Sequence, residues 1–375
     1  MKAIFITGAT GAIGSRLIPE LLKDNEVYLK LLIRAASQEG MQKRLDYILD
    51  FWDINRHEES VINRIEGFQG DITFENLGLG GNVYETLSKQ VTHIIHCATN
   101  IKLMLTLEEA RKYTLEGTKN ILKFAKRCIE RGQFKRFNYL STMEVAGTMK
   151  GIVPENFISQ KRSFLNTYEI AKAETENLLQ GLSKEGFPLT IYRPSMVVGD
   201  SATGKAITFQ FFYHLLEDAF LSPSSPILPF RPEWRFDIVP VDFVARAICA
   251  IYDKPETNGK IYNIVTGADF SIPSRALFTE LKNVLEKLTG KQLKSPREIP
   301  PQIGYTILSI LSIFSYGAAK KKIKFQQMLT RFLLLNQRFE NSRTKTELTR
   351  AGITIPKISD YLYTIGDYYL KNRKN

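Results

Sequence analysis

The sequence predicts an α/β protein, with a Rossmann-type doubly wound parallel sheet followed by a smaller, mostly helical C-terminal part. Two observations predict this fold. Short apolar runs alternate with amphipathic helical patterns through the first half of the chain, and strands that alternate with helices form parallel sheets. A glycine-rich turn, Gly8 to Gly14, joins the first apolar run to the first helical pattern, where such sheets carry their tightest connection.

The periodicity predicts the elements of the first half in order. The expected strands are Ala3–Thr7, Val27–Arg34, Ile65–Gly70, His93–Ala98, Phe137–Ser141 and Leu189–Arg193. The expected helices are Ser15–Lys23, a polar helix through Arg44 and Ile48, a long helix Glu108–Arg131, and Thr167–Leu182. After Gly204 the alternation fades, and Phe236–Val241 and Lys260–Val265 are expected to return to the sheet as late strands.

Composition limits the classes of function. The 375 residues are 43% hydrophobic and 24% charged, which is typical of an ordinary globular protein. The net charge of +12 suits nucleic acid, an anionic membrane or a phosphate-bearing substrate. No arginine-rich, aromatic-interleaved stripe is present, so nucleic acid is not expected.

The remaining composition argues against a metal and against export. The three cysteines and four histidines show no metal-ligand or disulfide spacing, so we expect no metal and no disulfide framework. Met1 stands directly before the first strand, with no signal or transit pattern ahead of it. We therefore expect a cytoplasmic protein.

The glycine turn predicts a dinucleotide site. Gly8 and Gly11 allow a sharp turn, and Gly11 and Gly14 let the backbone approach a pyrophosphate at the start of a helix. A purely structural glycine turn is the alternative. The candidate cofactor contacts in this turn are Gly8, Thr10, Gly11, Ala12, Ile13 and Gly14.

The ends of the next two strands predict which cofactor is bound. Arg34 ends the second strand, where an acidic residue would contact the ribose of NAD and an arginine suits the extra phosphate of NADP. We therefore expect NADPH, although a solvated arginine is the alternative. Asp71 and Ile72 follow the third strand, where the carboxylate can accept a hydrogen bond from the adenine amino group.

A tyrosine and a lysine indicate proton-transfer chemistry. Tyr168 and Lys172 lie four residues apart on one face of a predicted helix. A nearby ammonium is expected to lower the pKa of the tyrosine toward the working range. Thr142 follows the fifth strand, where its hydroxyl can bind the substrate oxygen. A tyrosine and a lysine often occur at this spacing by chance. Here the pair follows a strand that ends in Ser-Thr and a glycine turn earlier in the chain, which favours a catalytic role.

These motifs together resemble the extended short-chain dehydrogenase/reductase superfamily. Further stretches resemble its thioester reductase and fatty acyl-CoA reductase branch, the male-sterility-like NAD(P)-binding proteins. They are Leu31 to Ala35, Gly70 to Thr73 with Asn76 to Leu79, His96 to Asn100, Glu116 to Asn120, Tyr192 to Ser195 with Val198 to Asp200, and Val239 to Asp242. The resemblance covers about the first 265 residues well and the rest loosely.

The resemblance implies roles for particular residues. Thr142, Tyr168 and Lys172 would be catalytic, and Tyr168 and Lys172 would also contact the cofactor, with Lys172 holding the nicotinamide ribose. Ala98, Pro194 and Ser195 would line the nicotinamide. Thr114 departs from the branch, which usually has an asparagine there that braces the catalytic helix.

Domain organisation follows from the same reasoning. We expect an NADP-binding Rossmann domain over residues 1–205, with residues 236–265 returning to its sheet. Residues 206–235 and 266–375 are expected to form a substrate-binding helical cap.

The last third contains an apolar and basic segment, residues 303–335. Ile303 to Phe314 is almost wholly apolar but too short to span a bilayer. A lysine cluster, Lys320 to Lys324, and a second apolar run, Met328 to Leu335, follow it. The segment is interpreted either as a cap helix on the core with a solvated basic loop, as a peripheral membrane helix, or as the lining of an acyl tunnel whose lysines attract a phosphorylated carrier.

The resulting hypothesis is an NADPH-dependent reductase in lipid metabolism. It would reduce an acyl thioester, carried by coenzyme A or a carrier protein, to an aldehyde and onward to an alcohol in one version. One alternative is an NADPH-dependent reductase of a free ketone, aldehyde or sterol-like alcohol. Another is a non-catalytic NADPH-sensing scaffold, since the fold alone does not define function.

Overall fold

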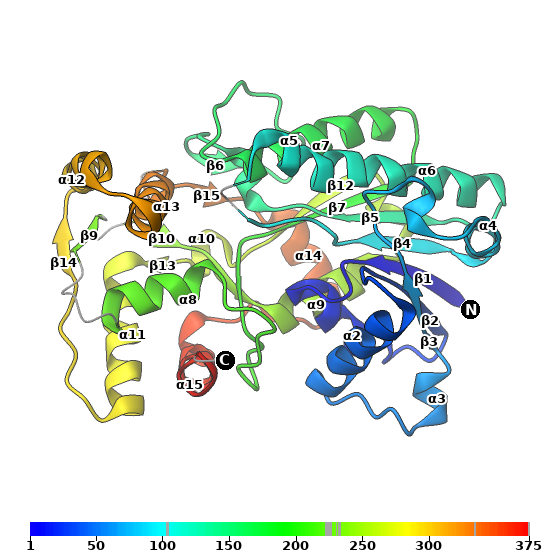
Figure 1. Ribbon diagram of the computed structural model, residues 1–375, viewed down its shortest axis with the longest axis horizontal. Coiled ribbons are helices and arrows are strands. Elements are labelled where there is room, and N and C mark those ends of the chain that lie inside the picture. The colour runs from blue at the N-terminus through cyan, green and yellow to red at the C-terminus, as the bar shows by residue number, and fades with distance from the viewer. Residues whose placement is uncertain (103–104, 222–226, 230, 232–233, 334, 374–375) are drawn as a thin grey trace.

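A seven-stranded parallel sheet forms the centre of the protein (Figure 1). The structure is a computed structural model that describes residues 1–102, 105–221, 227–229, 231, 234–333 and 335–373. The strands lie in the order β3 (Ile65–Gln69), β2 (Val27–Ile33), β1 (Lys2–Thr7), β4 (His93–His96), β5 (Arg136–Leu140), β7 (Leu189–Pro194) and β12 (Lys260–Ile264). The chain reverses its direction of winding between β1 and β4, and ligands of such sheets bind at the carboxyl ends beside this reversal. The predicted fold class is confirmed.

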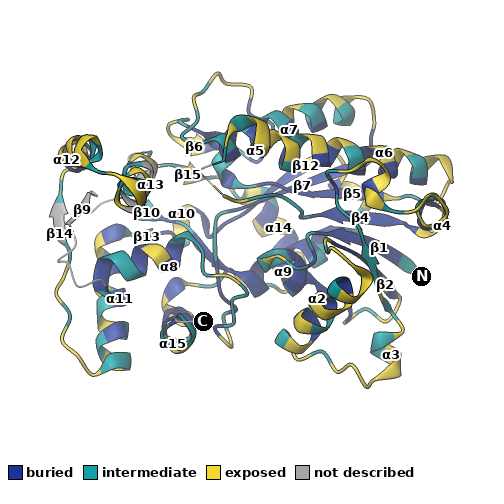
Figure 2. Ribbon diagram, viewed as in Figure 1, coloured by how far each residue is buried: buried dark blue, intermediate teal, exposed yellow. Residues whose placement is uncertain are grey.

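Helices cover both faces of the sheet, as Figure 1 shows. One face carries α4 (Gly81–Gln90), α5 (Leu107–Arg111), α6 (Gly117–Glu130) and α7 (Thr167–Lys184). The other carries α1 (Ala12–Leu21), α2 (Gln38–Phe51), α9 (Val241–Ile251) and α14 (Ser342–Arg350), while the short α3 (Glu59–Ile62) precedes β3. Each face has its own buried apolar cluster, because every strand alternates its side chains between the two layers (Figure 2).

The long helix expected over 108–131 is interrupted. Residues Lys112–Glu116 form a π-helical turn, η2, between α5 and α6. Within it, the hydroxyl of Thr114 hydrogen-bonds that of Thr99 at 2.9 Å, and the Thr114 carbonyl accepts from Thr118 at 2.6 Å. A π-turn accommodates one extra residue in a helix and often marks a functional site, and no local sequence pattern announces it.

The expected return of residues 236–241 to the main sheet is wrong. β11 (Ile238–Pro240) pairs with β8 (Met196–Val198) in a separate two-stranded sheet, and β10 (Arg235–Phe236) pairs with β13 (Ile272–Pro273). β8 follows β7 after a single residue, Ser195, so β11 pairs with the chain beyond the end of β7, while β12 pairs with β7 itself. Only the later of the two expected strands, over 260–265, joins the sheet.

The C-terminal part is mostly helical, as predicted. It contains α8 (Phe211–Leu216), the π-helical turn η4 (Glu217–Leu221), α10 (Gly267–Phe270), α11 (Ser274–Thr289), α12 (Pro301–Phe314), α13 (Gly317–Leu333) and α15 (Leu362–Asn372). Two further short pairings occur, β9 (Ile227–Pro229) with β14 (Arg297–Ile299), and β6 (Ile152–Val153) with β15 (Arg338–Phe339).

Three of these helices share a second apolar core. α8, α11 and α15 bury one face each in a common cluster. The ring centroids of Tyr213 on α8 and Tyr369 on α15 lie 5.1 Å apart, and the Tyr369 hydroxyl donates to Glu217. Among the described residues, no helix is both long and apolar enough to cross a membrane.

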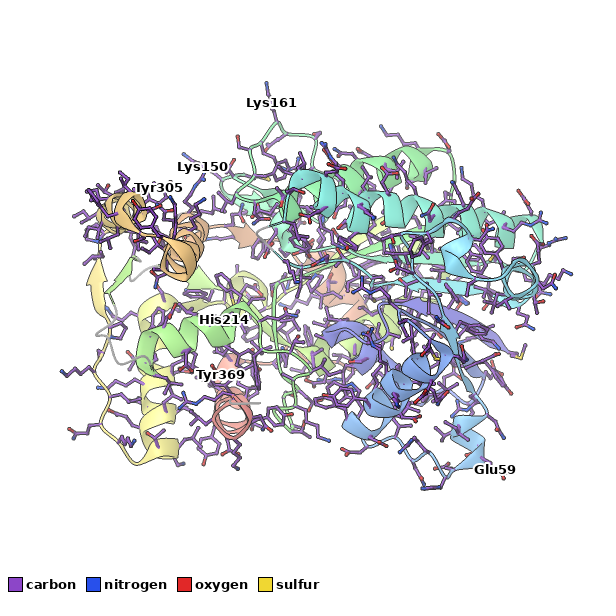
Figure 3. The ribbon with its side chains drawn as sticks, viewed as in Figure 1. Glu59, Lys150, Lys161, His214, Tyr305 and Tyr369 are labelled. Carbon is purple, nitrogen blue, oxygen red and sulfur yellow. The ribbon has the colours of Figure 1, made fainter. Side chains whose placement is uncertain are left out.

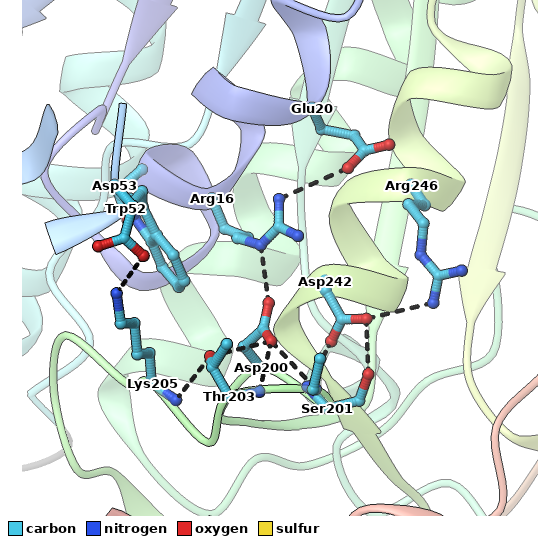
Figure 4. Close-up of polar contacts among 12 residues, drawn as sticks. Arg16, Glu20, Trp52, Asp53, Asp200, Ser201, Thr203, Lys205, Asp242 and Arg246 are labelled. Carbon is cyan, nitrogen blue, oxygen red and sulfur yellow. Dashed lines mark hydrogen bonds and ion pairs between the residues drawn. The ribbon is translucent and has the colours of Figure 1, made fainter. Parts of the chain in front are cut away.

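Two motif carboxylates connect the sheet domain to the loop that leads into the C-terminal part (Figure 4). Asp200 accepts from Arg16 of α1 at 3.0 Å and from the backbone of Thr203. Asp242 at the start of α9 accepts from the Ser201 backbone and hydroxyl, both at 2.8 Å. Burial raises the pKa of Asp200, but hydrogen bonds from Arg16 and Thr203 outweigh it and lower that pKa overall. These two carboxylates therefore have a structural role.

A buried ion pair fixes α7 against the sheet. Arg193 of β7 is fully buried and donates through Nε to Glu176 of α7 at 2.9 Å, while a second nitrogen forms an ion pair with the same carboxylate. Ser141, at the end of β5, also donates to Glu176. One more guanidinium nitrogen donates to the carbonyls of residues 154 and 156. The cluster therefore joins α7, β5, β7 and a loop.

We predict that Arg193→Met lowers the free energy of unfolding by about 3 to 5 kcal/mol, because it leaves the Glu176 carboxylate buried without its cation. Arg111→Met provides a matched control. Arg111 of α5 pairs with Glu174, which lies on the exposed side of α7, the helix that also carries Glu176. The stability of the Arg111→Met variant should stay within error of the wild type. Urea unfolding measures both variants, and equal losses would contradict the structural role of the buried pair.

Candidate functional site

The glycine turn packs as tightly as the sequence implied. Gly8 has φ +72°, and a Cβ there would lie 2.6 Å from the backbone nitrogen of Ala98. A Cβ on Gly14 would lie 2.2 Å from the Gly8 carbonyl oxygen. Gly11 is the N-cap of α1 and supplies no side-chain cap, and the first turn of α1 contains no acidic residue. The free backbone amides at the start of α1 are therefore suited to bind an anion such as a pyrophosphate.

Two arginines converge beside this turn. Arg34 follows β2, and its guanidinium lies 3.9 Å from Asp71. Arg44 of α2 donates to the Arg34 carbonyl and, at 2.8 Å, to the Thr10 hydroxyl. From the sequence we placed Arg44 on a helix but did not predict that it contacts Arg34 and Thr10 beside the glycine turn. The 3.6-residue period of α2, which turns Arg44 back toward the strand end, was the available signal.

The third strand ends as predicted, with Asp71 at its carboxyl edge. Asp71 accepts from the Thr73 backbone at 2.8 Å, which fixes the carboxylate in a tight turn. Ile72 is buried, and its carbonyl accepts from Asn120 of α6 at 2.8 Å. Asp71 therefore lies beside Arg34 at the end of β3, and its contact with adenine stays a prediction.

Tyr168 and Lys172 lie buried on the first turns of α7. Asn166 caps the helix by accepting from the Glu169 backbone at 2.9 Å. Lys172 donates to the Leu140 carbonyl at 2.8 Å and to the Tyr139 hydroxyl at 3.3 Å. Lys172 is thereby fixed to the carboxyl end of β5.

Thr142 stands beside Tyr168. It caps the short helix η3 (Met143–Ala146) by accepting from the Glu144 backbone at 3.3 Å, and η3 packs against α7. A hydrogen bond between the side chains of Thr142 and Tyr168 lowers the pKa of the tyrosine in part. The structure therefore brings together Thr142, Tyr168 and Lys172.

The electrostatics of this group differ from the expectation. Burial raises the pKa of Tyr168 well above its usual range, and Glu144 and Tyr139 add to the effect. Burial also lowers the pKa of Lys172 to about 8, against the opposing influence of Cys97 and Glu176. The expected lowering of the tyrosine pKa by Lys172 is wrong, because burial dominates and the Lys172 hydrogen bonds go to Leu140 and Tyr139. Tyr168 is therefore held as a neutral proton donor.

Two carboxyl groups that the sequence reasoning did not select flank Tyr168. Glu144 is half-buried, yet its Oε2 is enclosed without a hydrogen-bond partner in the described part of the chain. Burial raises the pKa of Glu144 to about 7. Burial likewise raises the pKa of Glu169 to about 8, against hydrogen bonds from Leu165 and Asn166 and with a further contribution from Glu144. The position of Glu144, two residues after Thr142, was the only signal in the sequence.

Thr114, which stands where the resembled branch has an asparagine, belongs to a buried hydrogen-bond chain that does not include Tyr168 or Lys172. Thr114 is buried, and its hydroxyl contacts Thr99. Behind it, His96 hydrogen-bonds the hydroxyl of Thr7 at 2.6 Å and that of Thr118 at 3.0 Å. Burial lowers the pKa of His96 to about 3, so the ring is neutral. This threonine and histidine chain braces β1, β4 and α6 without touching Lys172.

The predicted nicotinamide residues lie at the ends of β4 and β7. The Ala98 backbone donates to Thr7 at 3.3 Å, and Pro194 pairs with Ile264 at the end of β7. Ser195 donates to the half-buried Asp237 at 2.6 Å, so its hydroxyl has a structural partner. These residues share the carboxyl edge of the sheet with Thr142.

We predict that Glu144→Gln stabilises the protein at pH 8 by about 2 to 3 kcal/mol. The folded pKa lies near 7, above the ordinary value of 4.5, so ionisation opposes folding increasingly as the pH rises from about 4.5 to 7. At pH 4 the two proteins should have equal stability. The exposed Glu75→Gln is the control, and thermal unfolding at both pH values is the measurement. A stability difference of the same size at pH 4 and pH 8 would contradict the buried ionisation.

The fold and this geometry define a class of protein, a nucleotide-binding protein of the extended short-chain dehydrogenase/reductase type. Within that class, residues 6–248 match the model of the family described as male sterility protein, an NAD(P)-binding family. The match covers more than half of the chain, and the chain therefore belongs to this family. The predicted resemblance is confirmed.

Similar proteins share this fold at low identity. The chain is 28% identical over 300 residues to the aldehyde reductase lnaA of Aspergillus flavus, covering 76% of this chain and 27% of that protein. It thus spans about a quarter of that relative's length. The terminal R domain of the myxalamid PKS-NRPS pathway superposes with a TM-score of 0.80 at 22% identity, over 100% of this chain and 91% of that one. A thiolation-reductase di-domain of an archaeal non-ribosomal peptide synthetase superposes with a TM-score of 0.75 at 20% identity, over 100% and 76% respectively.

Proposed function

We propose that the protein is an NADPH-dependent reductase that converts an acyl thioester to an aldehyde. The observation that carries the proposal is the convergence of Thr142, Tyr168 and Lys172 at the edge of the sheet, beside the unfilled amides of α1. A neutral tyrosine at that place can donate a proton to a substrate oxygen. A purely structural protein has no need of such a donor.

The residues of the glycine turn fit a dinucleotide, because the start of α1 has no side-chain cap and no acidic residue, which leaves its backbone amides for a pyrophosphate. When bound, NADPH supplies a hydride to the carbonyl carbon of the substrate. Thr142 and Tyr168 hydrogen-bond the developing oxyanion, and Tyr168 donates its proton to that oxygen. The hemithioacetal then releases a thiol and leaves the aldehyde. Lys172, which the Leu140 carbonyl and the Tyr139 hydroxyl hold one helical turn after Tyr168, would bind the cofactor ribose.

The preference for NADPH is part of the proposal. Arg34 and Arg44 meet at the end of β2, and Arg44 is held there by Thr10. Two guanidinium groups favour the additional phosphate of NADP, through charge-assisted hydrogen bonds. Two converging guanidinium groups bind a phosphate more strongly than one exposed arginine does.

The thioester substrate is supported by the relatives. Two of the structures that superpose on this chain are reductase domains of synthetase systems, and one of them is joined to a thiolation domain. We propose coenzyme A or a carrier protein as the thiol. Reduction of a free aldehyde is the alternative, favoured by the similarity to an aldehyde reductase. Identification of the product shows whether reduction of the thioester stops at the aldehyde or continues to the alcohol.

We predict that Tyr168→Phe lowers kcat for NADPH oxidation with an acyl thioester by on the order of 10² to 10⁴. NADPH binding, measured by calorimetry, should remain unchanged. Tyr361→Phe is the matched control, since Tyr361 is also buried but donates to the Ile238 carbonyl in the second core. Release of one free thiol per thioester consumed tests the reaction class. A Tyr168→Phe variant with full turnover would sink the catalytic assignment, and turnover of ketones alone would favour the alternative reductase.

A separate prediction concerns the cofactor. Arg34→Ala and Arg44→Ala should each raise the KM for NADPH by about tenfold to hundredfold, and leave the KM for NADH nearly unchanged. Arg56→Ala is the control, because Arg56 lies nearby and pairs only with Asp46 and Asp50 among the described residues. Equal effects on NADPH and NADH would show that the arginines do not select the phosphate.

A further inference from the structure

Helix α12 exposes an apolar face that the fold leaves uncovered. Its sequence from Pro301 to Phe314 contains no charged residue, yet Ile310 is 52% and Phe314 is 75% exposed. The exposed large apolar residues of the helix are Ile303, Ile307, Ile310, Leu311, Ile313 and Phe314. Figure 2 shows α12 mostly in the exposed colour, and Figure 3 places Tyr305 of α12 at the periphery of the molecule.

These side chains form one broad face. At about 100° per residue, the exposed apolar positions cover an arc of roughly 160° around the helix. The opposite side contacts the protein through Pro301 and Gly304, which are buried, and through Ser309, which accepts from Gln327 of α13 at 3.1 Å. An ordinary surface helix buries its apolar side chains in the core and exposes its polar ones to water; α12 does the opposite.

The structure changes two of the sequence interpretations of this segment. A cap helix packed on the core is wrong for α12, because its apolar face points outward. A basic loop is also wrong, because residues 320–324 lie within helix α13. Lys320 is half-buried and Lys324 is exposed, whereas the side chains of residues 321 and 322 lie outside the described part. An outward face does not line an internal tunnel.

We propose that α12 is an in-plane membrane anchor that binds the surface of an anionic lipid bilayer. Its apolar face enters the boundary between headgroups and acyl chains, and Lys320 and Lys324 of the adjoining helix contact lipid phosphates. The helix has 14 residues, about 21 Å of length, so it lies along the surface and does not cross it.

Charge and shape favour lipid over a protein partner. A second copy of the chain would bring the same lysines and the same net charge of +12 to the contact, which opposes association. A helix-to-helix contact covers a narrow seam, whereas the apolar arc of α12 is broad. The helix also offers no charged side chain to fix the register of a protein partner.

The anchor lies close to the candidate site. Arg331, near the end of α13, is near enough to Glu169 to lower the pKa of that carboxyl, and Glu169 follows Tyr168 in α7. The hairpin of α12 and α13 therefore reaches from the proposed lipid surface to the catalytic helix. The proposal does not depend on the thioester reaction, since any substrate could be reduced by an anchored protein.

The test is flotation of the full chain with two kinds of vesicle, phosphatidylcholine alone and phosphatidylcholine with phosphatidylglycerol. We expect flotation with the anionic vesicles and on the order of tenfold less with the neutral ones, with binding reduced by salt. Ile310→Glu/Phe314→Glu should abolish flotation, and Lys320→Glu/Lys324→Glu should remove the preference for anionic lipid. Val83→Glu/Ile129→Glu changes two exposed apolar residues on α4 and α6 and should float like the wild type.

Other results would overturn the proposal. The proposal is overturned if the wild-type protein does not bind anionic vesicles. It is also overturned if the Ile310→Glu/Phe314→Glu variant floats like the wild type. A dimer on gel filtration that this variant alone converts to a monomer would assign the face to a second copy. A carrier protein that binds the wild type and not the variant, without vesicle binding, would assign it to the carrier. Thermal unfolding of each variant shows that it is folded.

Discussion

The buried pair of Glu176 and Arg193 is the constraint on which the candidate site depends. Glu176 lies one helical turn after Lys172, and Arg193 directly precedes Pro194 and Ser195. Ser141, the third member, directly precedes Thr142 and donates to the same carboxylate. Three segments that carry site residues are thus held together by one carboxylate. Since ions in a dry interior are costly unless fully paired, the geometry permits little displacement of α7 from the sheet.

The same burial that makes this cluster rigid determines the chemistry of its surroundings. It raises the pKa of Tyr168 and lowers that of Lys172, so both groups shift toward their neutral forms. Glu144 and Glu169 shift in the same direction. A concentration of shifted pKa values at one place is typical of a functional site. The site lies where the winding of the sheet reverses, between β1 and β4, and the glycine turn opens onto this edge.

The sequence predicts those parts of the structure that depend on local patterns. The strands and the glycine turn follow from periodicity and from steric need, and Tyr168 with Lys172 follows from helical spacing. Arg44 and Glu144 could not be selected, because their importance arises from contacts with distant segments. The same is true of the π-turn at Thr114 and of the separate pairing of β11 with β8. For α12, an apolar stripe looks the same in sequence whether it faces a core or the outside.

The residues at the sheet edge, the two arginines and the exposed helix suggest one arrangement. In the proposed arrangement, a positively charged protein would bind its cofactor at the glycine turn and hold a neutral tyrosine beside the substrate carbonyl. The proposed lipid-binding hairpin of α12 and α13 would place a lipid surface next to that site. Cofactor binding, proton donation and lipid binding depend on different residues, so each can be tested separately.

The central claim is that a thioester carbonyl carbon receives hydride from NADPH at Tyr168. The most direct measurement uses NADPH deuterated at the transferable C4 position with an acyl thioester, and determines the mass of the product. The account predicts an aldehyde with one deuterium at its carbonyl carbon, and one free thiol for each NADPH consumed. Deuterium found only in products of ketones, with the thioester intact, would contradict it.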